Sequence, residues 1–173
     1  VSSNYEDQLT RGISLSGESS SFFAEKRIEH IVSLIPRLNL KHEVIMDFGC
    51  GTGGSVRYLL EAFNPTSLTV VDISEESLRI LKARYKTEQV ISASPSALKT
   101  NSNPDLCFCN GVFHHILPND RQNATKIIYD SLKPRGYFCF WENNPWNPAT
   151  HLVMSRIPFD HNAQKIFPHQ GVK

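Results

Sequence analysis

Val-Ile-Met-Asp-Phe-Gly-Cys-Gly-Thr-Gly-Gly, residues 44–54, joins a short apolar run to a segment rich in glycine. The apolar run predicts a strand that is buried on both faces of a parallel sheet. Residues 55–63 then read as a helix, whose first N–H groups are free to bind a ligand. Glycine lets the intervening backbone approach that ligand closely. A strand, a glycine-rich turn and a helix in this order are typical of a nucleotide-binding crevice.

The glycine segment is compatible with two kinds of ligand. Gly49, Gly51 and Gly54 satisfy the dinucleotide pattern G-x-G-x-x-G, and Asp72 follows at about the spacing of a ribose partner. Asp47 argues for the other kind, because a carboxylate so close to the glycines would repel a pyrophosphate. It suits a cationic ligand that carries an ammonium and a sulfonium. A glycine turn that binds no ligand is the third interpretation.

Composition predicts an ordinary soluble domain. The chain has 173 residues, which is enough for one domain with a real core, and its net charge of +1 gives no indication of a nucleic-acid or membrane partner. No apolar run approaches the roughly 20 residues of a transmembrane helix. The cysteines form no C-x-x-C pair and predict buried free thiols in a reducing, cytoplasmic compartment; they are Cys50, Cys107, Cys109 and Cys139.

The rest of the chain alternates between strand and helix patterns. Residues 1–20 are polar and predict a flexible arm or lid, and residues 21–35 predict a helix that stops at Pro36. Further strands are expected at 68–73, 89–92, 105–109 and 137–141. Ser74 is expected to cap the helix after the second of the five strands, and a capping box at 119–122 to start a helix through 132. This alternation predicts an α/β fold with a doubly wound parallel sheet of order 3-2-1-4-5, with residues 44–47 at its centre.

Several segments resemble one enzyme family in the correct order. Asp-x-Gly-x-Gly-x-Gly at 47–53 resembles motif I of the class I S-adenosylmethionine-dependent methyltransferases. Residues 70–74 match the acidic motif of the second strand in that family, and residues 110–116 and 132–137 resemble its segments around strands four and five. Residues 142–148, Glu-Asn-Asn-Pro-Trp-Asn-Pro, resemble a subgroup of small-molecule methyltransferases. The resemblance covers nearly the whole chain.

The resemblance implies a Rossmann-like fold and methyl transfer from S-adenosyl-L-methionine to a small-molecule acceptor, with S-adenosyl-L-homocysteine as the product. Asp47 would lie by the amino acid part of the cofactor, Asp72 would accept hydrogen bonds from the ribose, and Ile73 would cover the adenine. Ser94, which ends strand three, could contact the adenine edge. The full set of cofactor residues that it implies is Asp47, Gly49, Cys50, Gly51, Asp72, Ile73, Ser94, Asn110 and Gly111.

The candidate catalytic residues are His115, His114 and Glu142. A histidine near neutrality could take a proton from the acceptor, or the two rings could only pack on the cofactor and bond to the backbone. Glu142 and Trp146 could orient the acceptor, or could belong to a turn fixed by prolines. A metal site is not expected, because adjacent side chains rarely converge on one ion.

Two other functions and one structural expectation stand beside this interpretation. A nicotinamide-dependent oxidoreductase and a non-catalytic, methyltransferase-like binding module are the alternatives. Family members normally end in strands six and seven, but too few residues follow Pro158 to form them. Residues 21–173 are therefore expected to form a methyltransferase-like domain that is incomplete at its carboxyl end. The sequence assigns no oligomeric state.

Overall fold

The computed structural model describes residues 20–98, 103–148, 152, 154–155, 163–164 and 166–167. Nearly all of the expected arm at 1–20 lies outside these residues, as does Pro158. The expected division into an arm and a domain therefore stays a prediction. No helix among the described residues is long and apolar enough to cross a membrane.

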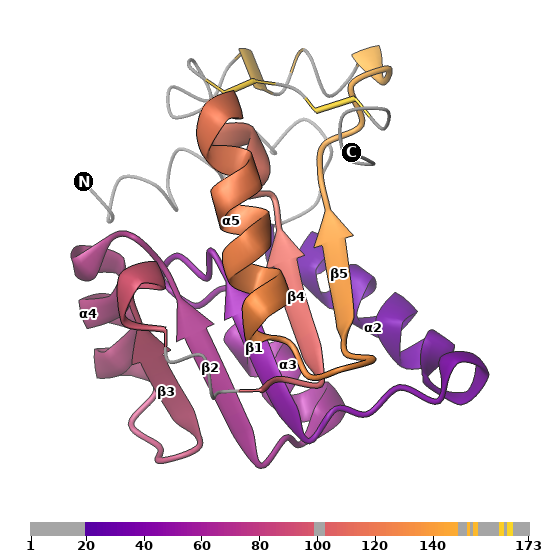
Figure 1. Ribbon diagram of the computed structural model, residues 1–173, viewed down its shortest axis with the longest axis vertical. Coiled ribbons are helices and arrows are strands. Elements are labelled where there is room, and N and C mark those ends of the chain that lie inside the picture. Colours follow the sequence, from indigo (N-terminus) through magenta and orange to yellow (C-terminus); the bar gives the residue numbers. More distant parts are fainter. Residues whose placement is uncertain are drawn as a thin grey trace.

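Five parallel strands form one sheet of order β3-β2-β1-β4-β5 (Figure 1). This is the α/β, Rossmann-like order that the sequence predicts. The strands are β1 (Val44–Phe48), β2 (Ser67–Val71), β3 (Val90–Ala93), β4 (Leu106–Asn110) and β5 (Tyr137–Trp141). β1 is central, and Asp47 lies opposite Val70 of β2 and Phe108 of β4.

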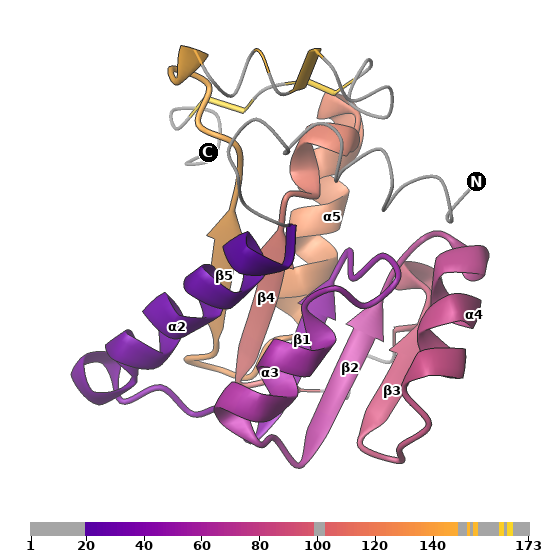
Figure 2. The ribbon, with the colours of Figure 1, turned by 180° about the vertical axis from the view of Figure 1, so that it is seen from behind.

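Helices cover both faces of the sheet. The helices are α2 (Ser20–Leu38), α3 (Val56–Phe63), α4 (Glu75–Arg84) and α5 (Pro118–Ser131), and two 3-10 turns lie at Pro95–Ala97 and Phe113–His115. Figure 1 shows α5 in front of the sheet, whereas Figure 2 shows α2 and α3 in front of the opposite face. The sheet is therefore buried on both sides, as continuous apolar strands require.

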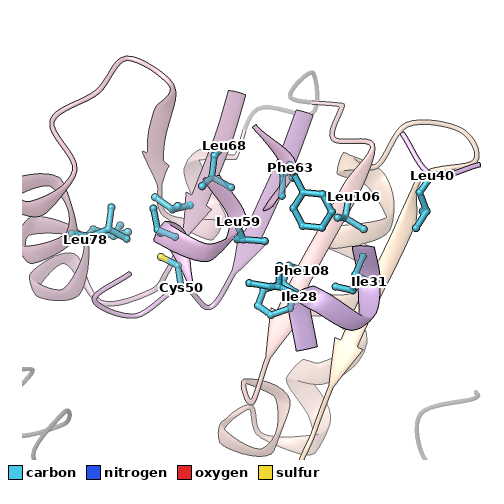
Figure 3. Close-up of a cluster of buried hydrophobic side chains, with 14 residues drawn as sticks. Ile28, Ile31, Leu40, Cys50, Leu59, Phe63, Leu68, Leu78, Leu106 and Phe108 are labelled. Carbon is cyan, nitrogen blue, oxygen red and sulfur yellow. The ribbon is translucent and has the colours of Figure 1, made fainter. Parts of the chain in front are cut away.

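The alternation of side chains along the strands divides the core into two parts. Ile45, Leu106 and Phe108 face α2, α3 and α4, and Figure 3 shows Phe108 beside Ile28 and Ile31 of α2. The intervening strand positions, among them Met46 and Cys107, pack with Phe113, Ala124 and Ile128 on the side of α5. Asn110 continues the alternation of Leu106 and Phe108, which explains why a residue of α2 can reach it.

Helix ends differ from the sequence prediction at two prolines. α2 continues past Pro36 to Leu38, because a proline in the last turn removes only one helical hydrogen bond. α5 begins at Pro118, directly after Leu117, without a side-chain cap, so the capping box expected at 119–122 does not form. Proline is favoured in the first turn, where its missing N–H has no helical partner. The expected cap at Ser74 is confirmed, since its Oγ accepts from Ser77 N at 3.2 Å.

Candidate functional site

The predicted site residues gather at the carboxyl ends of the strands. Asp47 lies in β1, Asp72 and Ile73 follow β2, Ser94 follows β3, Asn110 and Gly111 lie at the end of β4, and Glu142 follows β5. In a sheet of this order the chain leaves β1 and β4 toward opposite sides, which opens the edge of the sheet between their ends. Ligands of open α/β sheets bind at this edge.

The glycine loop has one position that packs on the protein and one that is open. Gly49 has a φ of +77°, its N–H donates to Val71 O at 2.7 Å, and a Cβ there would lie 2.3 Å from Val112 Cγ2. Gly51 has a φ of +52°, and apart from its chain neighbours no described residue lies within 4 Å of the Cβ that it lacks. Only glycine fits Gly49, whereas Gly51 offers bare backbone to a ligand.

Asp72 holds the glycine loop in place. Its Oδ2 accepts a hydrogen bond from Gly51 N and its Oδ1 accepts one from Ser74 N, both at 2.8 Å. An ionised carboxylate has about four lone-pair positions, so each oxygen can accept a second bond from a ribose hydroxyl. The sequence contains one signal of this role, because Asp72 lies two residues before the residue that caps α4. This is the spacing of an Asx turn.

Asp47 is the most unusual group of the site. It is only 2% exposed, and among the described residues its Oδ2 is buried without a hydrogen-bond partner. Burial, reinforced by the charge of Asp72, raises the pKa of Asp47 to about 7. Because buried carboxylate oxygens are normally hydrogen-bonded, this orphaned oxygen fits a ligand that donates to it, such as an ammonium group.

The three remaining loop residues differ in what they can offer a ligand. Ile73 is 87% exposed directly after Asp72, an apolar surface that an aromatic ring could cover. Cys50 is buried, and burial raises the pKa of its thiol far above the ordinary value, so it is a packing residue and not a reactive thiol. Ser94 lies 3.1 Å from Ser96 through their hydroxyl oxygens.

His114 and Glu142 form a buried pair that sequence reasoning did not predict. His114 Nδ1 lies 2.7 Å from Glu142 Oε2, and the other oxygen of Glu142 accepts from Phe113 N at 2.7 Å. His115 is exposed, and its ring centroid lies 3.9 Å from that of His114. Glu142 therefore orients His114, and the contact with an acceptor that the sequence offered as one interpretation stays a prediction. No sequence spacing reveals this pair, because it depends on β4 and β5 being neighbours.

Arg27 contacts a candidate site residue and was not predicted from the sequence to do so. Its Nη1 donates to Asn110 Oδ1 at the end of β4. The neighbouring Gly111 has a φ of +68°, and its N–H donates to Trp141 O at 2.8 Å. The one available signal was the position of Arg27 beside the buried stripe of α2, next to Ile28 and four residues before Ile31.

The segment after β5 has the properties of a turn and also presents an aromatic ring. Asn144 Oδ1 accepts from Trp146 N at 3.0 Å, which closes an Asx turn. Trp146 is 65% exposed, and its ring lies 6.0 Å, centroid to centroid, from that of Phe167. The turn that the sequence offered as one interpretation is present, and the role of Trp146 toward an acceptor stays a prediction.

Comparison with known proteins finds enzymes of one kind. A family model described as a methyltransferase domain matches residues 46–138. Trans-aconitate 2-methyltransferase from Escherichia coli O1:K1 is 25% identical over 150 residues, which are 86% of this chain and 57% of that protein. The enzyme of the same name from Rhodopseudomonas palustris BisB18 is 25% identical over 126 residues, 73% of this chain and 47% of that one. This chain thus spans about half the length of these curated relatives.

A solved structure supports the fold. The S-adenosylmethionine-dependent methyltransferase from Clostridium acetobutylicum ATCC 824 superposes with a TM-score of 0.57 at 24% identity. The match covers 65% of this chain and 48% of that one.

Proposed function

This chain belongs to the methyltransferase domain family, and on that premise we propose that it binds S-adenosyl-L-methionine and transfers its methyl group to a small-molecule acceptor. The observation that carries the proposal is Asp47 Oδ2 at the start of the glycine loop, a buried oxygen to which no described residue donates a hydrogen bond. An ammonium can donate to this oxygen, whereas the pyrophosphate of a nicotinamide cofactor would be repelled by it. The second product is S-adenosyl-L-homocysteine.

The cofactor residues have distinct roles in this proposal. Asp47 binds the ammonium of the cofactor, the second lone pairs of Asp72 accept from the two ribose hydroxyls, and Ile73 covers the adenine. Bare backbone at Gly51 lets the ligand approach. The other residues that border this space are Gly49, Cys50, Ser94, Asn110 and Gly111.

The bound cofactor supplies an electrophilic methyl group on a positively charged sulfur. The protein has to align an acceptor with that carbon, and alignment alone can provide effective molarities of about 10⁵–10⁸ M. The segments at 110–115 and 142–146 leave the ends of neighbouring strands β4 and β5, so we propose that they border the acceptor.

A buried histidine lies in one of these segments. With Glu142 as a carboxylate, His114 Nδ1 is the hydrogen-bond donor of the pair, and the Nε2 of a neutral imidazole is then a base. We therefore propose His114 as the base and Glu142 as the residue that positions it, the arrangement found where a third group orients a catalytic histidine. His115, which is exposed and in ring contact with His114, is the alternative base.

Calorimetry on the whole chain tests cofactor choice. The wild type should bind S-adenosylhomocysteine and not NAD. Asp72→Ala should weaken binding of S-adenosylhomocysteine by about 1–3 kcal/mol, because charged hydrogen bonds to the ribose and to Gly51 N are lost. Ser74→Ala is the matched control, since it removes only the cap of α4 and should leave affinity unchanged. Tight NAD binding, or no binding of S-adenosylhomocysteine, would contradict the proposal.

Turnover separates an enzyme from a non-catalytic binding module. Methyl transfer from labelled S-adenosylmethionine to small carboxylic acids, with trans-aconitate as the first probe, should appear with the wild type. Cofactor binding without transfer to any acceptor would favour the module.

The cytoplasmic location that the free cysteines suggest stays a prediction.

A further inference from the structure

The guanidinium of Arg27 lies half-buried between two strand ends and two aromatic rings. Its Nη1 donates to Asn110 Oδ1, and Asn110 is the register partner of Trp141 in β5. The central carbon of the guanidinium lies 6.0 Å from the ring centroid of Phe23 and 5.9 Å from that of Trp141. The rings limit the movement of the guanidinium plane, so Arg27 is held in place at the ligand-binding edge of the sheet.

Arg27 has no counter-ion among the described residues. No carboxylate of these residues lies within 4.0 Å of its nitrogens, and Asn110 Oδ1 is the one acceptor among them to which it donates a hydrogen bond. Burial lowers the pKa of Arg27, although the charge of Glu142 acts in the opposite direction. Glu142 does not supply the missing ion pair, because it lies more than 4.0 Å from the nitrogens of Arg27 and is paired with His114 instead.

Two exposed arginines contrast with Arg27. Arg57 pairs with Glu61 at 2.8 Å and Arg79 pairs with Glu76 at 2.7 Å, and both pairs are exposed to solvent. A partly desolvated cation without a counter-ion is costly, so proteins ordinarily pair such groups. At the edge of the sheet where ligands bind, the missing anion can come from a ligand.

We propose that Arg27, oriented by Asn110, binds a carboxylate group of a ligand at the carboxyl end of β4. The planar guanidinium has five N–H donors in a fork that matches a carboxylate, and one hydrogen bond to Asn110 leaves donors for it. The amide nitrogen of Asn110 can donate to the same anion. The inference rests on the proposed function, which allows two sources: the α-carboxylate of the cofactor or a carboxylate of the acceptor.

The first experiment tests the cofactor as the source. Calorimetry with S-adenosylhomocysteine and with 5′-methylthioadenosine, which lacks the amino acid part, compares the wild type with Arg27→Gln. If the cofactor supplies the carboxylate, Arg27→Gln should lose affinity for S-adenosylhomocysteine by about 10- to 100-fold and keep its affinity for 5′-methylthioadenosine. Arg27→Lys keeps the charge without the fork and should lose less. The matched control is Arg57→Gln, which removes an exposed arginine and should bind both compounds like the wild type.

The second experiment tests the acceptor as the source. Trans-aconitate and its trimethyl ester are titrated into protein saturated with S-adenosylhomocysteine. If the acceptor supplies the carboxylate, Arg27→Gln should bind S-adenosylhomocysteine normally, lose trans-aconitate affinity by at least 10-fold, and show no change with the ester.

Three results separate this inference from the proposed function. Equal loss of S-adenosylhomocysteine and 5′-methylthioadenosine by a folded Arg27→Gln would overturn the inference, because the defect would then not depend on the carboxylate. Unchanged binding of every carboxylate probe would overturn it too, while the proposed function stands. A wild-type chain that binds no S-adenosylhomocysteine would instead overturn the proposed function, and the inference that rests on it.

Discussion

The imidazole of His114 and the carboxylate of Glu142 meet in the interior, with Nδ1 2.7 Å from Oε2 and both side chains less than a tenth exposed. Glu142 follows β5, whereas His114 lies in the 3-10 turn Phe113–His115 after β4. Because the second oxygen of Glu142 accepts from Phe113 N, one carboxylate holds both the backbone of this turn and the imidazole of His114. The pair therefore connects the segment after β5 with the turn after β4, and it is also a candidate catalytic pair.

The contribution of the His114–Glu142 pair should be measurable in the free energy of unfolding. Glu142→Ala leaves a buried imidazole and the Phe113 N–H without their acceptors, and we expect it to lower the free energy of unfolding by about 2–4 kcal/mol. Denaturant titration at neutral pH measures the loss. Glu61→Ala makes the same chemical change in an exposed pair with Arg57 and should cost no more than about 0.5 kcal/mol. Equal costs for the two variants would show that the buried pair contributes nothing beyond a surface contact.

Turnover should distinguish the two histidines. If His114 is the base, His114→Gln should reduce methyl transfer by about 10²-fold or more while affinity for S-adenosylhomocysteine stays within a few-fold of the wild type. His115→Ala should then have little effect, since the exposed ring beside His114 would not be the group that takes the proton. Single-turnover rates with a saturating acceptor provide the comparison. A loss of turnover in His115→Ala alone would show that the base is His115 and not His114.

Alanine substitutions at two glycines of the same loop should have different effects, one on stability and the other on ligand affinity. Gly49→Ala places a methyl 2.3 Å from Val112 Cγ2 at a φ of +77°, so overpacking and backbone strain should together cost about 2–4 kcal/mol of stability. The methyl of Gly51→Ala meets no described residue beyond its chain neighbours within 4 Å and should cost only the strain, about 1 kcal/mol, but it would occupy space offered to the ligand. Melting temperatures and calorimetry separate the two effects. A Gly51→Ala protein with wild-type affinity would show that the ligand does not approach this backbone.

The sequence predicted the sheet and its order because buried parallel strands leave a local signal. The apolar runs of β1, β4 and β5 are bounded by glycine, proline and polar residues, and the alternation with helices restricts the topology. The cap at Ser74 is equally local, since donor and acceptor are three residues apart. The weakest strand prediction was β3, whose residues are only partly buried, and it lies one residue later than expected.

Contacts between distant segments could not be predicted in this way. Arg27 reaches Asn110 across 83 positions of sequence, and Glu142 reaches His114 across 28. Each contact needs the packing of α2 on the sheet or the pairing of β4 with β5 before the side chains can meet. The sequence therefore singled out Asn110, His114 and Glu142 as candidates, but it did not predict that His114 contacts Glu142 or that Arg27 contacts Asn110.

The titration of Asp47 offers a test that needs no acceptor. Burial and the charge of Asp72 raise its pKa to about 7, above the value of about 3.9 in an unfolded chain, so between these pH values the folded state holds a proton that the unfolded state has lost. Stability should therefore fall as pH rises from about 4 to about 7, and each pKa unit is worth about 1.4 kcal/mol. Asp47→Asn cannot ionise, so between pH 4 and pH 8 the wild type should lose about 2–4 kcal/mol more than this variant in denaturant titrations. Asp130→Asn changes an exposed carboxylate and should follow the wild-type curve.

Saturating S-adenosylhomocysteine should flatten the wild-type curve, because a neighbouring ammonium favours the charged form of Asp47. Parallel curves for the wild type and Asp47→Asn would show that this carboxylate is not held in the unpaired, buried state on which its proposed role depends.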